Sequence, residues 1–326
     1  ANNQIEIRLA GCRVRSLYID NSQGRGGEPW IRMNPSFVSG GTREARTMKK
    51  IGLHITFILG STLLLALPAF AQFTQNEIQK LLADDAETDD RFGYSVAIDG
   101  DTAVIGAYRE DDSGTIDNGA AYVFTRSAGT WTQQAKLLAS DKASYDLFGE
   151  SVAIDGDTAV IGAWGESDGD TVDSGAAYVF VRSADAWTQQ AKLLASDKSQ
   201  GDRFGASVAI DGDTAVIGAH WRYEDGISWA GAAYVFARSN GTWMQQAKLQ
   251  ASDKAEGDRF GGSVAIDGDF AVIGAHGKDD SSTIDNGAAY VFTRSAGTWT
   301  QQAKLLANDK EAGDYFGVSV AIDGDT

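Results

Sequence analysis

The stretch FGYSVAIDGDTAVIGA occupies residues 92–107, and close copies of it begin at Phe148, Phe204 and Phe260. A fifth copy begins at Phe316 and continues to the last residue of the chain. Successive opening phenylalanines are 56 residues apart. A fixed period of this length, with so much identity, indicates one supersecondary unit that stacks on copies of itself.

The first unit has the pattern of four antiparallel β-strands. Residues 95–99 and 102–107 are apolar runs rich in β-branched residues, and Gly100 between them supplies the positive φ of a tight turn. Residues 120–125 form a third such run after a polar loop. Residues 131–138 mix apolar and polar side chains, so we expect a fourth, outer strand near solvent. No apolar stripe of helical period follows residue 72.

The first three strands are apolar on both faces, so both faces of each sheet must be covered. Twisted four-stranded sheets that cover one another are the blades of a β-propeller. The predicted fold is therefore all-β, an incomplete propeller of four full blades plus a partial one. Since propellers have roughly four to eight blades, we expect further blades beyond residue 326. The expected blades span about 92–139, 148–195, 204–251 and 260–307, with the partial blade at 316–326.

The start of the chain divides into two segments ahead of the repeats at residues 72–326. Residues 48–71 have the order of an export signal, with two lysines after Met48, an apolar run, and Ala-Phe-Ala before Gln72. We expect cleavage there, although the run is long enough to be an uncleaved anchor. Residues 1–47 show no periodic pattern, so we expect an upstream or disordered segment outside the fold. Residues 79–83 resemble a lone outer strand.

Charge and cysteine content exclude several classes of function. Residues 72–326 hold 19 of the 28 basic and 41 of the 45 acidic residues. Nucleic acid is excluded as a partner because a phosphate backbone needs a basic footprint. Cys12 is the only cysteine, so the chain has no disulfide framework and no cysteine metal site. The export signal predicts a secreted protein, extracellular or on the cell surface, with the periplasm as an alternative and no membrane span after cleavage.

The FG opening at residues 92–93 and the GA close at residues 106–107, kept in phase in each copy, resemble the FG-GAP repeat. That family builds the propeller head of integrin α chains and occurs in exported bacterial proteins, which this chain resembles more. The resemblance covers about residues 76–326 and implies a propeller that recognises proteins or carbohydrates. Integrin repeats carry a DxDxDGxxD calcium loop between the first two strands. Here residues 99–101 (DGD) cannot supply the roughly six to eight oxygens that calcium takes, so that site is not carried over.

The loop after the second strand varies most between copies, and varied loops on a constant scaffold usually carry binding. The third loop has three aromatic residues that can stack on sugars or on a protein, or else cover the blade edge. The position that opens these loops holds a flat ring in every copy. Because two of these rings are histidines that share the slot with Tyr and Trp, packing accounts for them without proton chemistry. The candidate ligand-binding residues are Tyr108, Trp164, His220, Trp221, Tyr223, Trp229 and His276.

The same loops are acidic in the first, second and fourth copies. Calcium is the one cofactor that their carboxylates suggest, although the spacing matches no known cation motif. The alternative, which the spacing favours, is a set of solvated acidic loops. The candidate calcium ligands are Asp111, Asp112, Asp117, Asp168, Asp170, Asp173, Asp279, Asp280 and Asp285.

Three functions remain open from the sequence. The first is a secreted, non-catalytic module that binds an extracellular protein or glycan. The second is a propeller-type glycan hydrolase or lyase that uses loop carboxylates such as Asp168 and Asp170, and the third is a purely structural surface module. No catalytic residue is assigned. The aspartates two residues before each FG are expected to act in turns, because an active site is normally built once: Asp90, Asp146, Asp202, Asp258 and Asp314.

Overall fold

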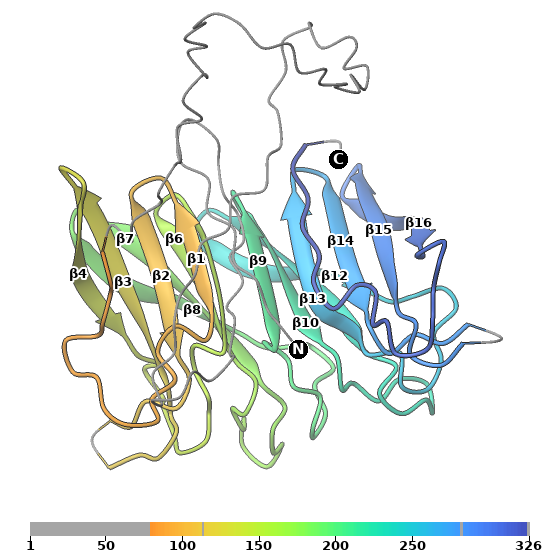
Figure 1. Ribbon diagram of the computed structural model, residues 1–326, viewed down its shortest axis with the longest axis horizontal. Coiled ribbons are helices and arrows are strands. Elements are labelled where there is room, and N and C mark those ends of the chain that lie inside the picture. Colours follow the sequence, from red (N-terminus) through yellow and green to blue (C-terminus); the bar gives the residue numbers. More distant parts are fainter. Residues whose placement is uncertain (1–78, 113, 281–282, 325–326) are drawn as a thin grey trace, which may run out of the picture. The chain divides into compact units, whose positions relative to one another are not determined.

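The computed structural model describes residues 79–112, 114–280 and 283–324, and Figure 1 shows their arrangement. The sequence-based expectations for residues 1–47 and for a signal peptide at residues 48–71 lie outside the described residues. Residues 81–324 belong to one compact unit. In the described ranges, no helix is long and apolar enough to cross a membrane.

Four antiparallel sheets make up the described fold, and each contains four strands in chain order. The first sheet contains β1 (Val96–Asp99), β2 (Thr102–Ala107), β3 (Ala120–Ser127) and β4 (Thr130–Leu137). The second contains β5 (Ser151–Asp155), β6 (Thr158–Ala163), β7 (Ala176–Ser183) and β8 (Ala186–Leu193). The third contains β9 (Ser207–Asp211), β10 (Thr214–Ala219), β11 (Ala232–Ser239) and β12 (Thr242–Leu249). The fourth contains β13 (Phe260–Asp267), β14 (Phe270–Ala275), β15 (Ala288–Ser295) and β16 (Thr298–Leu305).

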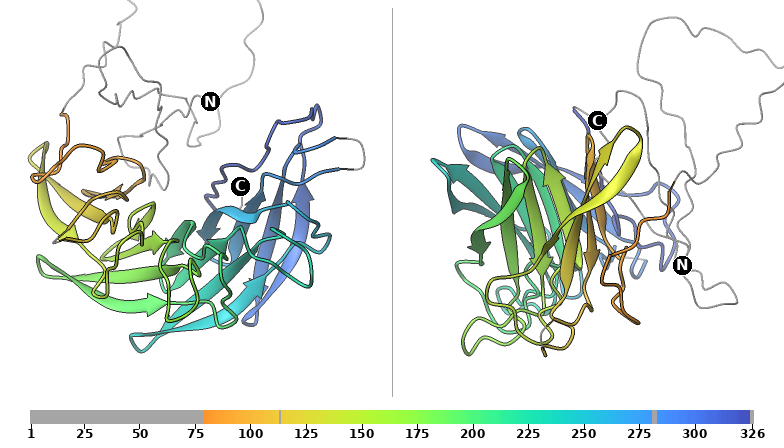
Figure 2. Two further views of the ribbon diagram at one scale, coloured as in Figure 1. Left: turned by 90° about the horizontal axis from the view of Figure 1, so that it is seen from below. Right: turned by 90° about the vertical axis from the view of Figure 1, so that its left-hand side faces the viewer.

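Within this unit the sheets follow one another in chain order. The innermost strands β1, β5, β9 and β13 contact their neighbours closely, whereas the outermost strands β4, β8, β12 and β16 hardly touch, so the sheets fan outward (Figure 2). This is the arrangement of propeller blades. The predicted all-β fold with a 56-residue repeat is confirmed.

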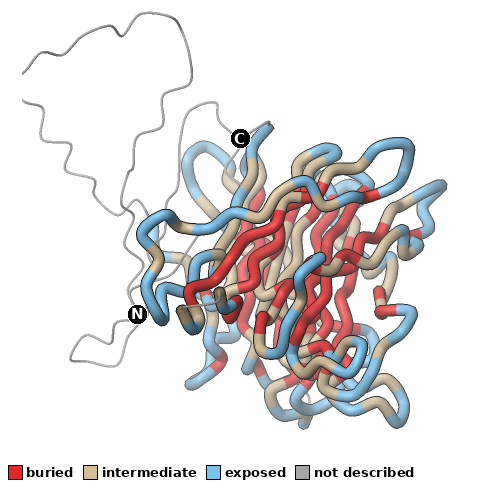
Figure 3. The backbone as a smooth tube through the Cα atoms, turned by 90° about the vertical axis from the view of Figure 1, so that its right-hand side faces the viewer, coloured by how far each residue is buried: buried red, intermediate tan, exposed pale blue. Residues whose placement is uncertain are grey.

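Burial follows the predicted strand patterns. Strands β2, β6 and β10 are buried along their whole length, while the outer strand β4 has exposed and half-buried residues along most of its length (Figure 3). A separate apolar cluster fills each boundary between blades. Between the first two blades, Val104 and Val123 pack with Ile161 and Tyr178. Each blade is thus stabilised mainly by its neighbours, as in other repeat proteins.

The FG and GA parts of the repeat meet at the joint between blades. Phe148 is fully buried and packs edge-on against Tyr178 and Phe180, with ring centroids 5.5 Å and 6.0 Å away. A Cβ atom at Gly106 would lie 1.9 Å from the carbonyl oxygen of Gly149. Two backbones can therefore approach this closely only where the second strand carries glycine.

One predicted strand is wrong. Residues 79–83, expected as a lone outer strand, form no strand in the structure. A strand needs a hydrogen-bonded neighbour, and none of the four described sheets pairs a strand with this segment. Ala83 and Leu81 instead pack against Ile105 and Tyr122 of the first blade.

Candidate functional site

Two sets of loops lie together at one face of the blades, which we call the loop face. It consists of the loops after each second strand (108–119, 164–175, 220–231 and 276–287) and the connections that lead into each FG motif. These loops lie at the lower ends of the strands in Figure 1. Backbone N–H groups of Tyr145 and Phe148 donate hydrogen bonds to carbonyl oxygens of Ile116 and Asn118, at 2.8 and 2.9 Å. Each varied loop is thereby tied to the start of the next blade.

In the first and fourth blades, the ring that opens the loop lies against the residue that follows FG in the same blade. Tyr94 and Tyr108 meet edge to face, with centroids 4.5 Å apart. In the fourth blade a Cβ atom at Gly262 would lie 2.6 Å from His276 Nδ1. The variable residue after FG therefore decides what the ring at the loop start packs against.

A continuous run of aromatic rings and one guanidinium crosses the loop face of the second and third blades. The Arg203 guanidinium lies between two indoles, 4.2 Å from the ring centroid of Trp164 and 3.3 Å from that of Trp221. The centroids of Trp221 and Trp229 are 5.9 Å apart. We call Trp164, Arg203, Trp221 and Trp229 the aromatic–arginine run. Cation–π contacts of this kind hold the flat faces of the rings in place.

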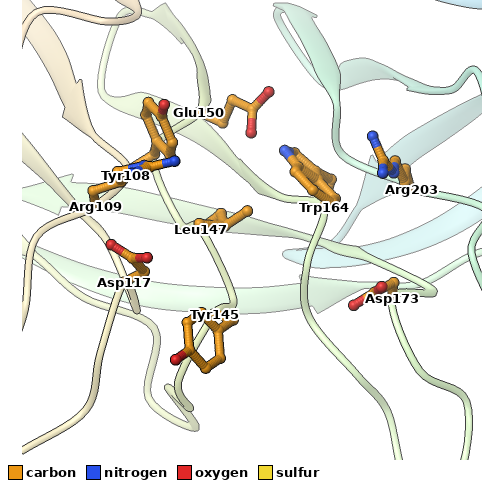
Figure 4. A pocket seen from close by; sticks show the side chains of 9 residues that line it. All are labelled: Tyr108, Arg109, Asp117, Tyr145, Leu147, Glu150, Trp164, Asp173 and Arg203. Atoms are coloured by element: carbon orange, nitrogen blue, oxygen red, sulfur yellow. The ribbon is translucent and has the colours of Figure 1, made fainter. Parts of the chain in front are cut away.

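A pocket opens beside this run, between the first and second blades (Figure 4). Tyr108 and Trp164, the rings that open two successive loops, lie on either side of it, and Glu150 lies near both. Trp164 stands between Glu150 and Arg203 in this view. The lining residues are Tyr108, Arg109, Asp117, Tyr145, Leu147, Glu150, Trp164, Asp173 and Arg203.

Glu150 is an acidic group of this pocket whose proton affinity is altered by burial. Burial raises the pKa of its carboxyl to about 7, and the positive charge of Arg203 opposes this shift only in part. Among the described residues its carboxylate makes no hydrogen bond or ion pair. An unpaired carboxyl that holds its proton near neutral pH can both donate and accept a hydrogen bond.

His220 and His276 lie side by side, with ring centroids 6.5 Å apart. Burial, with His276, Arg203 and Arg259 nearby, lowers the pKa of His220 to about 3. Burial and Arg259 also lower the pKa of His276. Both rings are therefore neutral at neutral pH, and their role as packing or ligand-binding groups stays a prediction.

Several candidate calcium ligands are engaged by other groups of the loop face. Asp112, Asp168 and Asp280 pair with Lys142, Lys198 and Lys310. Asp111 and Asp279 accept hydrogen bonds from the N–H groups of Asp117 and Asp285, both at 2.7 Å, and Asp170 is exposed. Asp117, Asp173 and Asp285 have φ near +50°, which aspartate adopts more readily than most residues. No three metal-ligating side chains in the described ranges lie close enough to hold an ion, and calcium binding stays a prediction.

The predicted turn role of the aspartates before FG is confirmed. Asp146 accepts a hydrogen bond from the N–H of Ala143 at 2.6 Å. The other copies make the same bond three residues back in the chain, at 2.6 or 2.7 Å: Asp90, Asp202, Asp258 and Asp314.

The repeat can be compared with known families by its sequence. A family model described as the FG-GAP repeat matches residues 76–124, 131–180, 187–236, 243–292 and 299–326. The chain belongs to the FG-GAP repeat family. A search of curated proteins found no match to this chain.

The FG-GAP motif explains which functional positions the sequence revealed and which it did not. The motif residues form the joint, so the rings in the varied loops after GA were recognisable as candidates, and Trp164, Trp221 and Trp229 do lie together. Tyr223, also predicted, is 58% exposed and has no ring contact in the part of the chain described.

Glu150 and Arg203 were missed. The position after FG reads Tyr94, Glu150, Ala206 and Gly262 in the four blades. Variation directly beside an invariant FG-GAP pair is the sequence signal that could have identified Glu150. Arg203 lies directly before FG, and only the stacking of blades brings it between two tryptophans.

Proposed function

We propose that this FG-GAP propeller is a non-catalytic recognition module of an exported protein, and that it binds an extracellular protein or glycan through its loop face. The aromatic–arginine run carries this proposal. Trp and Arg dominate the energetics of binding surfaces, because they offer a large contact area with a fixed orientation. A run that extends from a pocket to an exposed tryptophan gives a ligand several such contacts.

The backbone at Trp229 supports the proposal. Trp229 has φ +52° and is 47% exposed, at the position where the other three repeats carry aspartate. A bulky residue in the left-handed region is strained, and such strain persists mostly at functional sites. The fold alone favours aspartate here, so the tryptophan fits a role in binding.

Exposed aliphatic side chains add to the same face. Ile116, Val172 and Ile284 occupy one repeat position beside the left-handed residue, and each is exposed. Apolar groups gathered on one face mark interaction sites more often than groups scattered singly.

Binding to a glycan array and to immobilised extracellular proteins tests the proposal. Alanine at Trp221 and Trp229 together is expected to weaken binding by about tenfold or more, because each removes a large aromatic contact. Met244→Ala is the matched control, because Met244 is 62% exposed but lies on the outer strand β12, away from the loop face. Equal binding by all these proteins, or no binding by the unaltered chain, would contradict the proposal and favour a structural module.

The alternative of a glycan hydrolase or lyase has less support. Asp168, one of its two carboxylates, pairs with Lys198, and Asp170 is exposed on the loop. Turnover of a polysaccharide that is lost on replacing both aspartates by alanine would favour that alternative.

A further inference from the structure

The pocket between the first two blades differs from the equivalent positions in the next blades. There the residue after FG is Ala206 or Gly262, and the space beside Gly262 is taken by the His276 ring. Only in the second blade does this position hold a carboxyl, Glu150, next to an aromatic ring at the loop start. The carboxyl in the pocket lining is therefore a feature of this one pair of blades and not of the repeat.

Two rings from successive blades form the sides of this pocket. Tyr108 and Trp164 face the space near Leu147 and Glu150, and Arg203 covers the far side of the Trp164 indole (Figure 4). One face of Trp164 is thus held by a cation and the other faces the pocket. The volume is about 430 Å³, within the range that proteins use for small ligands.

The polar groups of the lining are balanced in charge. Arg109 and Arg203 are donors, Asp117 and Asp173 are acceptors, and the Glu150 carboxyl, with a pKa of about 7, is both. A strongly charged ligand gains little from such a set. A ligand with many hydroxyl groups and one apolar face gains both hydrogen bonds and ring contact.

We infer that this pocket binds one uncharged saccharide unit, which stacks on Trp164 and hydrogen-bonds through its hydroxyl groups to Glu150. The inference rests on the proposed recognition function and adds the ligand class and the site. A lysine side chain from a partner protein is the competing occupant, since rings and a carboxylate also suit an ammonium group. Two guanidinium groups in the lining oppose that occupant by charge repulsion.

Titration of the full chain with glucose, galactose and N-acetylglucosamine, followed by tryptophan fluorescence and ligand-observed NMR, tests the inference. At least one of these sugars is expected to bind. Trp164→Ala and Glu150→Ala are each expected to weaken that binding about tenfold or more, through loss of the stacking surface or of a hydrogen bond. Met244→Ala is the control and is expected to leave it unchanged, because Met244 lies on β12 and does not line the pocket.

Glu150→Gln separates the two occupants. Glutamine keeps a donor and an acceptor, so binding of an uncharged sugar is expected to change by no more than about threefold. An ammonium ligand loses its ion pair in this variant, so N-acetyl-lysine amide serves as the competing probe. Thermal melting of each variant shows that the protein tested is folded.

Any of three results would overturn the inference. The first is that none of the three sugars binds, and the second is that Trp164→Ala binds sugar as tightly as the unaltered chain does. The third is that N-acetyl-lysine amide binds and Glu150→Gln abolishes that binding. None of these decides the proposed function. That function fails separately, if loss of Trp221 and Trp229 leaves binding to arrays and immobilised proteins intact.

Discussion

The Ser95 hydroxyl donates a hydrogen bond to the carbonyl oxygen of Gly149, with 2.7 Å between the two oxygens, across the joint of the first two blades. The next three joints repeat this bond at 2.7 to 2.8 Å, from Ser151 to Gly205, Ser207 to Gly261 and Ser263 to Gly317. The same carbonyl oxygen lies where a Cβ atom of the preceding GA glycine would be. The FG glycine, the serine and the GA glycine therefore form a single contact, which explains why they repeat together.

Replacement of a GA glycine is expected to be far more damaging than replacement of a turn glycine. In Gly162→Ala the new Cβ would lie 1.9 Å from the Gly205 carbonyl oxygen, so two backbones must separate. We expect the free energy of unfolding to fall by about 3 kcal/mol or more. Gly156→Ala is the control. It has φ +56° and open space around it, so the cost is about 1 kcal/mol. Equal denaturation midpoints for the two variants would contradict the role of the joint.

A hydrogen bond between side chains also links the first two blades at the periphery. The Tyr178 hydroxyl donates to Asp141 at 2.9 Å, and Lys192 donates to the same carboxylate at 2.6 Å. Tyr178→Phe removes one of these bonds and is expected to lower the free energy of unfolding by about 1 kcal/mol in urea denaturation. Tyr223→Phe, at an exposed hydroxyl, is the control and should change stability by less than about 0.5 kcal/mol. Equal losses of unfolding free energy in both variants would show that the hydrogen bond between Tyr178 and Asp141 adds nothing to stability.

The Glu150 carboxyl is expected to make the fold less stable as the pH rises through the weakly acidic range. Its folded-state pKa of about 7 lies above its ordinary value of 4.5, so the folded state holds a proton that the unfolded state has released. Stability from this group is therefore present below about pH 4.5 and is lost as the pH approaches 7. Glu150→Gln should raise the free energy of unfolding at pH 8 by on the order of 2 kcal/mol relative to the unaltered chain.

The exposed Glu256 offers the matched control for this experiment. Glu256→Gln should leave the pH profile of thermal stability unchanged. A Glu150→Gln profile that runs parallel to that of the unaltered protein between pH 4 and 8 would disprove the raised pKa.

His220 is expected to make the fold less stable as the pH falls, which is the opposite of the effect of Glu150. Its folded-state pKa of about 3 lies below the ordinary value of 6.5. On acidification the unfolded state therefore binds a proton that the folded state does not bind. Stability is lost as the pH falls from about 6.5 toward 3. His220→Tyr places the ring of the first copy in the same slot and should remove this part of the acid sensitivity in melting curves. Equal acid sensitivity of the melting curves in His220→Tyr and in the unaltered protein would contradict the lowered pKa of His220.

The fold was predictable from the sequence because the same pattern of apolar strands recurs in each copy of the repeat. Apolar runs on both faces of three strands fixed the need for covering sheets, and Gly100 marked the first turn. The prediction of a lone strand at residues 79–83 was wrong, because local resemblance to an outer strand carries no information about a pairing partner. A strand forms only where a neighbour offers hydrogen bonds.

The site was predictable in part. Trp164, Trp221 and Trp229 stood out as rings in varied loops, and the structure brings them together. Arg203 joins them only through contacts between blades, which no local pattern records. Glu150 gains its raised pKa from burial at a joint, and burial at a single variable position is not visible in sequence.

Hydrogen–deuterium exchange of the full chain, with and without the array glycan that it retains best, tests the central claim that binding occurs at the loop face. The account predicts slower amide exchange in the loops at 164–175 and 220–231, with no change in the β-turns at 127–130 and 183–186 on the opposite face. Slower exchange confined to those β-turns, or no change at either face, would contradict it.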